Sequence, residues 1–361
     1  MPDTRVDPSA EPSDDRGVPL FLRGLWYFAC ASADLRSGRT LAKSILGEPV
    51  LLVRGSDGAP FALLDICPHR GIPLRYGTIE GNEVQCCYHG WRFGADGRCT
   101  DIPSLVEGQP LDPSRIRVRT YPLAERQGVI WIFMGTAADA AAPLPEPPTL
   151  PDVDAGSLHI HERMTFPCAI DHAVVGLMDP AHGPFVHRSW WWRPARSAHL
   201  KEKRFVPSEL GFTMARHRPS SNSRAYKLLG GAPETEIAFR LPGIRIEHIR
   251  AGGNVLVGLT ATTPVSETET EVNHLIYWTM PWLTPLVPLL RPFARTFLRQ
   301  DRDVVVMQQE GLKHRPPLML IDDADRPAKW YMRLKRAFAT AHAEGRPFEN
   351  PVRERTLRWK S

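Results

Sequence analysis

The order of apolar and polar residues changes along the chain. From Gly24 to about Met134, short apolar runs are separated by Gly, Pro, Asn and Asp. Four of these runs cover residues 48–54, 60–65, 83–87 and 129–134. Runs of this length, bounded by turn-forming residues, predict an antiparallel β domain.

The second half of the chain mixes two periodicities. Its strand-like runs lie at 244–249, 254–260 and 271–279, and its helical segments lie near 170–180, 292–310 and 329–343. This mixture predicts an α+β domain. Between the halves, residues 135–156 are rich in Ala and Pro without periodicity, which is typical of a semi-stiff linker.

These patterns predict an α+β protein in four parts. The parts are a disordered N-terminal arm at 1–20, a β domain at 21–136, a linker at 137–155 and an α+β domain at 156–361.

One of the predicted helices carries a carboxylate on its apolar face. Pro292 suits the first helical position and Gly311 suits the end, so we expect the helix to span about 293–310. At 100° per residue, Asp301 falls in an apolar stripe, whereas Asp303 falls on the opposite face. The stripe consists of Phe293, Ala294, Phe297, Leu298, Val304 and Val305. A carboxylate among apolar groups is costly unless it is paired or binds a metal, so Asp301 is a candidate ligand, with a buried salt bridge as the alternative.

Length and composition limit the class of protein. The chain has 361 residues, 24% of them charged, and a net charge of +5, without a basic tract that indicates nucleic acid. No apolar run approaches the roughly 20 residues of a membrane span, and the polar N-terminus lacks a secretory signal. We expect a cytoplasmic protein whose six cysteines are reduced, so that Cys and His at close spacing indicate metal binding.

Two such pairs stand in the β domain. Cys67-x-His69 and Cys86-x-x-His89 provide two thiolates and two imidazoles, a set that serves either a tetrahedral zinc or a Rieske [2Fe–2S] cluster. Each short pair can give one ligand to each of two irons. This order favours the Rieske cluster, because zinc fingers have a Cys pair followed by a His pair.

A second candidate metal site lies in the α+β domain. Asp179, His182 and His187 stand within GLMDPAHGPFVHR, and Asp179 and His182 share a helix face. Gly183-Pro184 breaks the helix and lets His187 turn back towards His182. Two histidines and a carboxylate form the triad that binds non-heme Fe(II), with Asp301 as the carboxylate. The alternative is two ordinary histidines near a helix end.

The stretch CPHRG…CxYHGW resembles the Rieske domain of Rieske-type non-heme iron oxygenases. The resemblance implies that Cys67 and Cys86 bind one iron of the cluster and that His69 and His89 bind the other. Respiratory Rieske proteins have further cysteines where this chain has Ile72 and Tyr88, so the bracing disulfide is missing, as in the oxygenases.

Cys87 departs from the family pattern, because it stands where the family usually has proline. We expect it to be a small buried thiol beside the cluster, with direct involvement in the cluster as the alternative.

The resemblance extends to the catalytic domain, for which it implies a curved antiparallel sheet around a helix. QDRDVVVMQQ is similar to the helix that carries the family's ligand carboxylate, which again indicates Asp301. In the family, the residue at Asp179 links a cluster histidine of one subunit to an iron histidine of the next in a homotrimer. Relatives often have Asn just before this Asp, where this chain has Val175 and Gly176.

The resemblance implies the terminal oxygenase of a multicomponent system, of the single-subunit type. No dinucleotide-binding motif is present, so we expect electrons from a separate reductase or ferredoxin. The expected reaction uses O₂ to hydroxylate or demethylate a small apolar, aromatic or polycyclic substrate. The alternatives are an arene cis-dihydroxylating dioxygenase and a Rieske electron-transfer protein without oxygenase activity. Residues 190–192, three tryptophans, either pack in the core or an interface, which we favour, or stack on the substrate.

Overall fold

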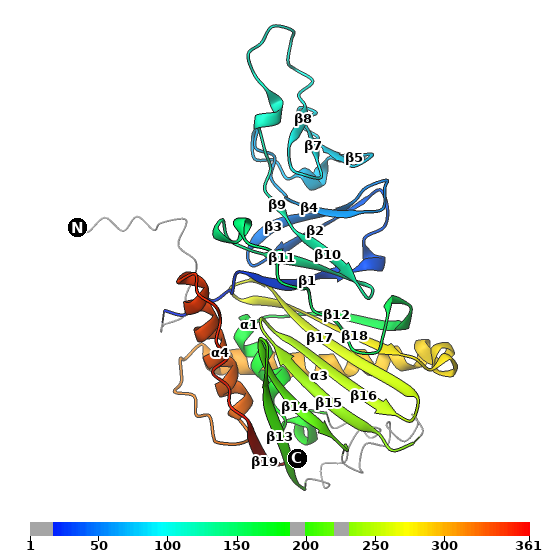
Figure 1. Cartoon of the computed structure of the whole chain (residues 1–361), viewed down its shortest axis with the longest axis vertical. Coiled ribbons are helices and arrows are strands. Elements are labelled where there is room, and N and C mark those ends of the chain that lie inside the picture. Colours follow the sequence, from blue (N-terminus) through cyan, green and yellow to red (C-terminus); the bar gives the residue numbers. More distant parts are fainter. Residues whose placement is uncertain (1–16, 188–198, 220–230) are drawn as a thin grey trace, which may run out of the picture. The chain divides into compact units, whose positions relative to one another are not determined.

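The computed structural model describes residues 17–187, 199–219 and 231–361, and the chain forms two compact units (Figure 1). The N-terminal unit comprises Gly24–Leu150 and Asp154–Leu158. The C-terminal unit comprises the described residues up to Arg23 together with Pro151–Val153 and His159–Ser361. The three tryptophans at 190–192 lie outside the described residues.

The described part of the N-terminal unit is built from three small antiparallel sheets. Their strand orders are β1-β11-β10, β2-β3-β4-β9 and β5-β6-β7-β8. The strands are β1 Leu25–Ala31, β2 Arg39–Ile45, β3 Glu48–Arg54, β4 Pro60–Leu64, β5 Thr78–Glu80, β6 Glu83–Gln85, β7 Arg92–Gly94, β8 Cys99–Asp101, β9 Thr120–Tyr121, β10 Leu123–Arg126 and β11 Val129–Met134. The predicted antiparallel β domain is confirmed. The predicted strand at 83–87 ends at Gln85, because the chain turns at Cys86.

The C-terminal unit has an 8-stranded sheet in the order β12-β18-β17-β16-β15-β14-β13-β19. The strands are β12 Leu158–Phe166, β13 Leu200–Ser208, β14 Gly211–His217, β15 Glu234–Arg240, β16 Ile244–Ala251, β17 Asn254–Ser266, β18 Glu269–Trp278 and β19 Arg355–Lys360. Adjacent strands of this sheet pair antiparallel, from β18 at one end of the series to β19 at the other. The chain therefore has the predicted α+β class.

Four α-helices of the described chain accompany this sheet: α1 Ile170–Met178, α2 Gly183–Val186, α3 Val287–Leu312 and α4 Arg326–Ala343. The long helix α3 crosses one face of the sheet (Figure 1). Two apolar clusters join α3 to that face, one around Trp278 and Ala294 and the other around Val272, Leu298 and Val305. The predicted arrangement of an antiparallel sheet around a helix is confirmed. None of the described helices is long and apolar enough to cross a membrane.

The predicted start of α3 at Pro292 is wrong. The helix begins at Val287, and Pro292 lies inside it. Pro292 removes one backbone hydrogen bond, but Val287 and Leu290 pack against the cluster around Trp278. This packing maintains the first turns of the helix despite the proline.

The predicted faces of α3 are largely as expected. Ala294, Leu298 and Val305 are buried, and the Asp301 side chain is 14% exposed whereas that of Asp303 is 57% exposed. Val304 is the exception, because it is 40% exposed. It borders a cavity described below instead of packing on the sheet.

Helix α1 is anchored by a buried ion pair. Lys335 of α4 is 2% exposed, and its Nζ lies 2.7 Å from both carboxylate oxygens of Asp171. The same ammonium group donates to the carbonyl of Leu20 at 3.1 Å, and Val18 is also buried. Val18 and Leu20 therefore take part in the packing of this unit, although they belong to the predicted arm at 1–20, of which residues 1–16 lie outside the described chain.

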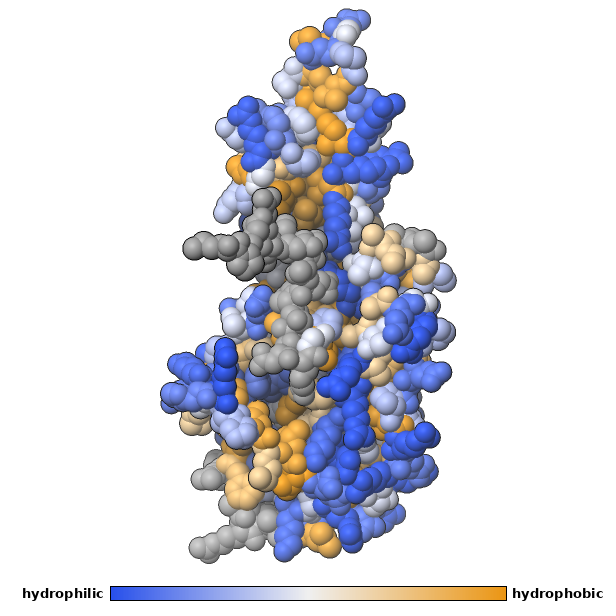
Figure 2. All heavy atoms as spheres, turned by 90° about the vertical axis from the view of Figure 1, so that its left-hand side faces the viewer, coloured by the Kyte–Doolittle hydropathy of each residue, from blue (hydrophilic) through white to orange (hydrophobic). Residues whose placement is uncertain are grey.

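Apolar side chains also reach the surface of the C-terminal unit. Figure 2 shows such groups on the face of the molecule that carries α4. The segment between α3 and α4 exposes Leu318 by 63% and Met319 by 86%. Phe185 of α2 and Met307 of α3 are each 61% exposed.

Candidate metal centres

The two Cys-His loops of the N-terminal unit have the same backbone conformation. They span residues 67–72 and 86–91, and in each the cysteine N–H donates to the carbonyl five residues later, at 2.8 Å. The N–H of the glycine at the fifth position of each loop donates back to the cysteine carbonyl. The distance is 2.9 Å from Gly71 to Cys67 and 3.1 Å from Gly90 to Cys86. Both glycines have positive φ, 73° and 74°, a conformation that other residues rarely adopt. The sequence thus forms two copies of one turn.

The four predicted ligands of these loops converge. Cys67 and Cys86 are 1% and 3% exposed. Burial raises the pKa of the Cys67 thiol to about 11, and the hydrogen bond and the charge interaction with Cys86 act in the same direction. The rings of His69 and His89 lie 4.4 Å apart between centroids. The Nδ1 atoms of both rings are buried without a hydrogen-bond partner in the described chain. Two buried thiols beside two unpartnered imidazole nitrogens fit the donor set of a [2Fe–2S] Rieske cluster.

The aromatic neighbours of these loops fix the imidazole rings. Trp91 stacks on His69 at 4.5 Å between centroids and an interplanar angle of 6°. Tyr88, which is 54% exposed, lies 4.0 Å from His89, and the Arg70 guanidinium sits 5.7 Å from the Tyr88 ring centroid. His89 is therefore held at the edge of the loop, within reach of the surface.

The expectation that Cys87 is buried is wrong. Cys87 is exposed, because it occupies the second position of the turn at 86–91, where the side chain points away from the core that holds Cys86. All six cysteines are free thiols, so neither loop carries a disulfide.

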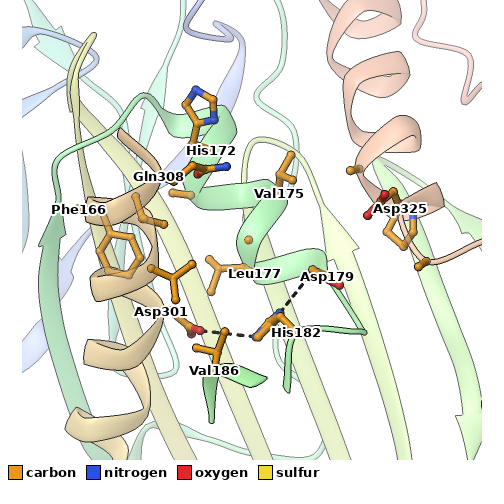
Figure 3. A pocket seen from close by; sticks show the side chains of 17 residues that line it. Phe166, His172, Val175, Leu177, Asp179, His182, Val186, Asp301, Gln308 and Asp325 are labelled. Atoms are coloured by element: carbon orange, nitrogen blue, oxygen red, sulfur yellow. Dashed lines mark ion pairs between the residues drawn. The ribbon is translucent and has the colours of Figure 1, made fainter. Parts of the chain in front are cut away.

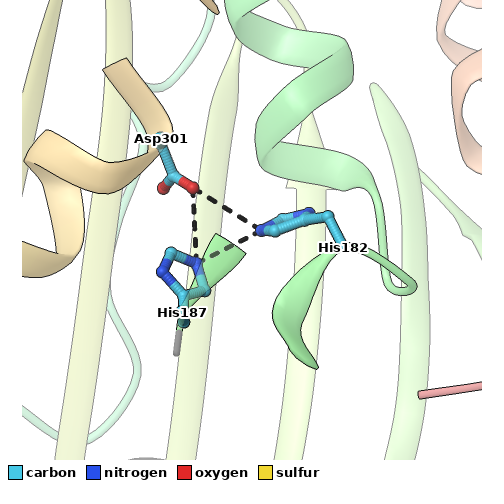
Figure 4. Close-up of side chains that lie close together, drawn as sticks. All are labelled: His182, His187 and Asp301. Atoms are coloured by element: carbon cyan, nitrogen blue, oxygen red, sulfur yellow. Dashed lines mark hydrogen bonds and ion pairs between the residues drawn. The ribbon is translucent and has the colours of Figure 1, made fainter. Parts of the chain in front are cut away.

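In the C-terminal unit, the single turn of α2 brings its two flanking histidines together. His182 precedes α2 and His187 follows it, and the His187 N–H donates to the Gly183 carbonyl at 3.0 Å. The Nε2 atoms of the two histidines lie 3.2 Å apart (Figure 4). The histidines converge as expected, but the predicted cause is wrong. Helix α1 ends at Met178, so Asp179 and His182 do not share a helix, and Gly183-Pro184 begin α2 instead of breaking a helix.

Helix α3 supplies the carboxylate. Asp301 Oδ1 lies 3.6 Å from His182 Nε2 and 3.3 Å from His187 Nε2 (Figure 4). The three candidate ligand atoms all lie within 4.8 Å of one another. Asp303 is directed elsewhere, with an Oδ1 atom 3.9 Å from Arg302.

Both histidines have the hydrogen bonds that a metal ligand needs. His182 Nδ1 lies 3.5 Å from Asp179 Oδ2, and His187 Nδ1 lies 3.1 Å from Gln300 Oε1. Because both partners are acceptors, we assign the proton of each ring to Nδ1, which leaves both Nε2 lone pairs facing Asp301. Two lone pairs and a carboxylate oxygen that converge on one point fit a divalent metal ion.

Burial dominates the electrostatics of this site. It raises the pKa of Asp301 to about 6, against the opposing charges of His182 and Arg245. It also lowers the pKa of His187 to about 4, so this imidazole is neutral at physiological pH. Burial also acts to lower the pKa of His182. The hydrogen bond with Asp179 and the negative charges of Asp301 and Asp179 outweigh it, so the pKa of His182 is raised. A bound cation would lower the free-energy cost of keeping the buried Asp301 carboxylate ionised.

Sequence reasoning missed three residues here. Gln300 orients His187, and Phe297 stacks on the His187 ring at 3.7 Å and 14°. Phe297 belongs to the predicted apolar stripe, and Gln300 is the neighbour of Asp301, so the helical phase contained a signal for both. Arg245 comes from the distant strand β16, and nothing local to its sequence indicates its place.

A cavity of about 240 Å³ adjoins the second site (Figure 3). Its wall includes Asp179, His182 and Asp301, and α1 contributes Val175 and Gly176. The Asp179 carboxylate is fixed in this wall, because the Ala181 N–H donates to its Oδ1 at 2.7 Å. Asp179 thus contacts His182 on one side and faces a cavity on the other.

Comparison with known proteins bears on both sites. Residues 25–122 match the Rieske [2Fe-2S] domain, and residues 170–341 match the vanillate O-demethylase oxygenase C-terminal domain. The chain belongs to the Rieske oxygenases. The predicted [2Fe–2S] cluster is the one that names the matching Rieske domain, and one solved structure of similar fold, dicamba monooxygenase, contains a non-heme iron.

Several Rieske oxygenase components resemble parts of this chain. The oxygenase component of dicamba O-demethylase from Stenotrophomonas maltophilia is 36% identical over 173 residues, which are 47% of this chain and 48% of that protein. The oxygenase component of chloroacetanilide N-alkylformylase from Rhizorhabdus wittichii is 37% identical over 175 residues, 47% of this chain and 48% of that protein. The chain spans about half the length of these curated relatives.

Solved structures extend the likeness of fold to most of the Rieske oxygenase chain. Dicamba monooxygenase bound to dicamba has a TM-score of 0.73 at 24% identity and covers 90% of this chain and 99% of its own. Pseudomonas putida CBB5 NdmA with caffeine has a TM-score of 0.68 at 19% identity, covering 89% and 92%. At these identities the likeness concerns the fold alone.

Proposed function

We propose that this Rieske oxygenase is the terminal oxygenase component of a multicomponent system. It takes electrons from a separate reductase or ferredoxin and uses O₂ to hydroxylate or oxidatively demethylate an aromatic or polycyclic apolar substrate. The observation that carries the proposal is the second donor set, in which His182, His187 and Asp301 converge within 4.8 Å. A pure electron carrier has no use for such a set.

Each centre has a proposed set of ligands. Cys67, His69, Cys86 and His89 hold the [2Fe–2S] cluster, and His182, His187 and Asp301 hold the mononuclear iron. When bound, the cluster supplies electrons one at a time and the iron supplies the place where dioxygen is activated.

The surrounding residues prepare the iron ligands. Asp179 and Gln300 each accept the Nδ1 proton of one histidine, which keeps Nε2 free as a ligand. Phe297 covers one face of the His187 ring and restricts the access of water to it. The site is therefore arranged before any metal binds, which lowers the entropy cost of binding.

We further propose that the active form is a homotrimer, in which the N-terminal unit of one copy approaches Asp179 of the next. Asp179 would then accept hydrogen bonds from His182 of its own chain and from a cluster histidine of the neighbour. The cavity beside Asp179 and the exposed Phe185, Met307 and Met319 support an interface on this unit. A cytoplasmic location stays a prediction.

The relatives leave two reactions open. Dicamba O-demethylase and chloroacetanilide N-alkylformylase are named for removal of a substituent from oxygen or nitrogen. A further relative, the 3-chlorobenzoate-3,4-dioxygenase oxygenase subunit of Comamonas testosteroni, is named for a dioxygenation. It is 32% identical over 180 residues, which are 48% of this chain and 40% of that protein. Arene cis-dihydroxylation is therefore the second candidate.

Oxygen uptake tests the proposal. The purified protein, with a surrogate reductase and NADH, is offered a panel of aromatic and polycyclic compounds under ¹⁸O₂. One labelled atom in the aromatic product indicates hydroxylation, and two indicate dihydroxylation. Demethylation gives an unlabelled phenol together with formaldehyde, because the atom from O₂ leaves with the methyl carbon. Asp301→Asn is the control and should show no coupled uptake. A cluster that is reduced and reoxidised, with no substrate-dependent uptake across the panel, would support the electron-carrier alternative.

A further inference from the structure

A group of polar side chains lies on one face of the large sheet. Arg245 on β16 pairs with Thr260 on β17, which pairs with His274 on β18, so the three side chains share a face. Glu247 is two residues along from Arg245 and shares that face. A Cβ on Gly258 would lie 3.7 Å from His274 and 3.9 Å from Glu247, so both residues are direct neighbours of Gly258. We call Arg245, Glu247, Thr260 and His274 the polar group.

The polar group lies on the face that α3 covers. Val272, two residues before His274, packs against Leu298 and Val305 of α3. Ile249, two residues after Glu247, belongs to the cluster that contains Ala294 of α3. The polar group thus sits between two apolar clusters, opposite the stretch of α3 that carries Asp301.

Electrostatic effects also place Arg245 close to the iron ligands. Burial is the main influence on the pKa of Asp301, and the charges of His182 and Arg245 oppose it. Burial likewise lowers the pKa of His187, and Arg245 acts in the same direction. Both influences agree with the position of the polar group opposite the stretch of α3 that carries Asp301.

The charges within the polar group cancel. Arg245 Nη2 donates to Glu247 Oε2 at 2.9 Å, and the two side chains are 23% and 21% exposed. His274 Nδ1 lies 2.9 Å from Thr260 Oγ1, and burial lowers the pKa of His274 to about 4, so its ring is neutral. The group therefore offers donors from Arg245 and acceptors from Glu247 with no net charge.

We propose that the polar group recognises the substrate of the oxygenase and selects a neutral hydrogen-bonding substituent, such as a carboxamide, over a carboxylate of the same shape. The proposal rests on the proposed function. An amide carbonyl accepts from Arg245 while its N–H donates to Glu247, so both charged groups keep partners. A carboxylate meets the Glu247 carboxylate in a partly buried site, and this repulsion offsets its attraction to Arg245.

Three aromatic probes of one shape and different charge test this selection. Benzoate, benzamide and benzamidine are titrated into the purified holoprotein by calorimetry. The native protein should bind benzamide most tightly, with the Kd of both charged probes higher by about tenfold or more. Glu247→Gln removes the opposing charge from Arg245 and should shift the preference to benzoate. Arg245→Gln removes the positive charge of the group while Glu247 keeps its negative charge, and should shift the preference to benzamidine.

The surface variant Asp303→Asn is the matched control and should keep the native order of affinities. A native protein that binds benzoate as tightly as benzamide overturns the proposal. So does an unchanged order in both folded variants, or the lack of saturable binding of every probe. Iron content and substrate-dependent O₂ uptake, measured in parallel, separate this failure from failure of the proposed function.

Discussion

Replacement of Asp301 by asparagine changes metal binding and stability in opposite directions. Burial raises the pKa of this carboxyl from 3.8 to about 6. A rise of about 2 units corresponds to about 3 kcal/mol for ionising the group inside the metal-free protein. Asparagine has nearly the same shape without the charge. We therefore expect Asp301→Asn to lose the mononuclear iron and, once free of that iron, to be more stable than the metal-free native protein.

The pH dependence of this difference follows from the direction of the shift. Because the pKa is raised in the folded state, the unfolded chain releases its proton first as pH rises from 3.8 to about 6. The stability of the metal-free native protein therefore falls through that interval and stays low above it. Asp301→Asn lacks this loss. Its advantage should reach up to about 3 kcal/mol at pH 7 and about half of that at pH 5.

The assay combines iron analysis, visible absorption and urea unfolding. Both proteins are freed of mononuclear iron with a chelator under anaerobic conditions, and the cluster colour shows that the N-terminal unit is intact. Asp303→Asn, on the exposed face of α3, should keep all of its iron. Loss of the mononuclear iron from Asp303→Asn instead of Asp301→Asn would refute the assignment by helical phase. Equal stabilities at pH 7 would refute the electrostatic reasoning.

Three further variants, one of them with a matched control, test individual residues. Asp179→Asn should keep iron and cluster yet abolish coupled turnover, measured as product formed per O₂; full turnover would exclude a bridging role. Lys335→Met leaves the largely buried Asp171 carboxylate with the Tyr331 hydroxyl but without its charged partner, so urea unfolding should show a loss of about 3–5 kcal/mol. The exposed Lys313→Met should change stability by less than about 0.5 kcal/mol, and similar values for both lysines would contradict this account. Cys87→Ser should keep the visible spectrum of the cluster, since the thiol is exposed; a bleached protein would make Cys87 a ligand.

Local patterns in the sequence predict much of this molecule. Helical phase distinguishes Asp301 from Asp303, because one apolar stripe on α3 faces the sheet. On α3 the local preference of the chain and its packing therefore agree. The sequence also predicts that His182 and His187 converge, and they lie 3.2 Å apart, although Gly183-Pro184 begin α2 instead of breaking a helix.

Other features depend on distant parts of the chain. Pro292 favours a helix start, but α3 begins at Val287, because packing against the sheet outweighs the local preference. Arg245 shares a face with His274 only through the register of β16, β17 and β18, which no single segment encodes. The exposure of Cys87 follows from the backbone of its turn, which spacing alone does not define.

The most direct test of two separate metal centres in one chain is the ratio of iron to acid-labile sulfide in anaerobically purified protein. A Rieske cluster together with a mononuclear iron predicts about three irons for every two sulfides. The ratio should fall to about one in Asp301→Asn, with the colour unchanged. A native ratio of one would contradict the second iron centre, and a colourless protein that contains zinc and no sulfide would contradict both centres.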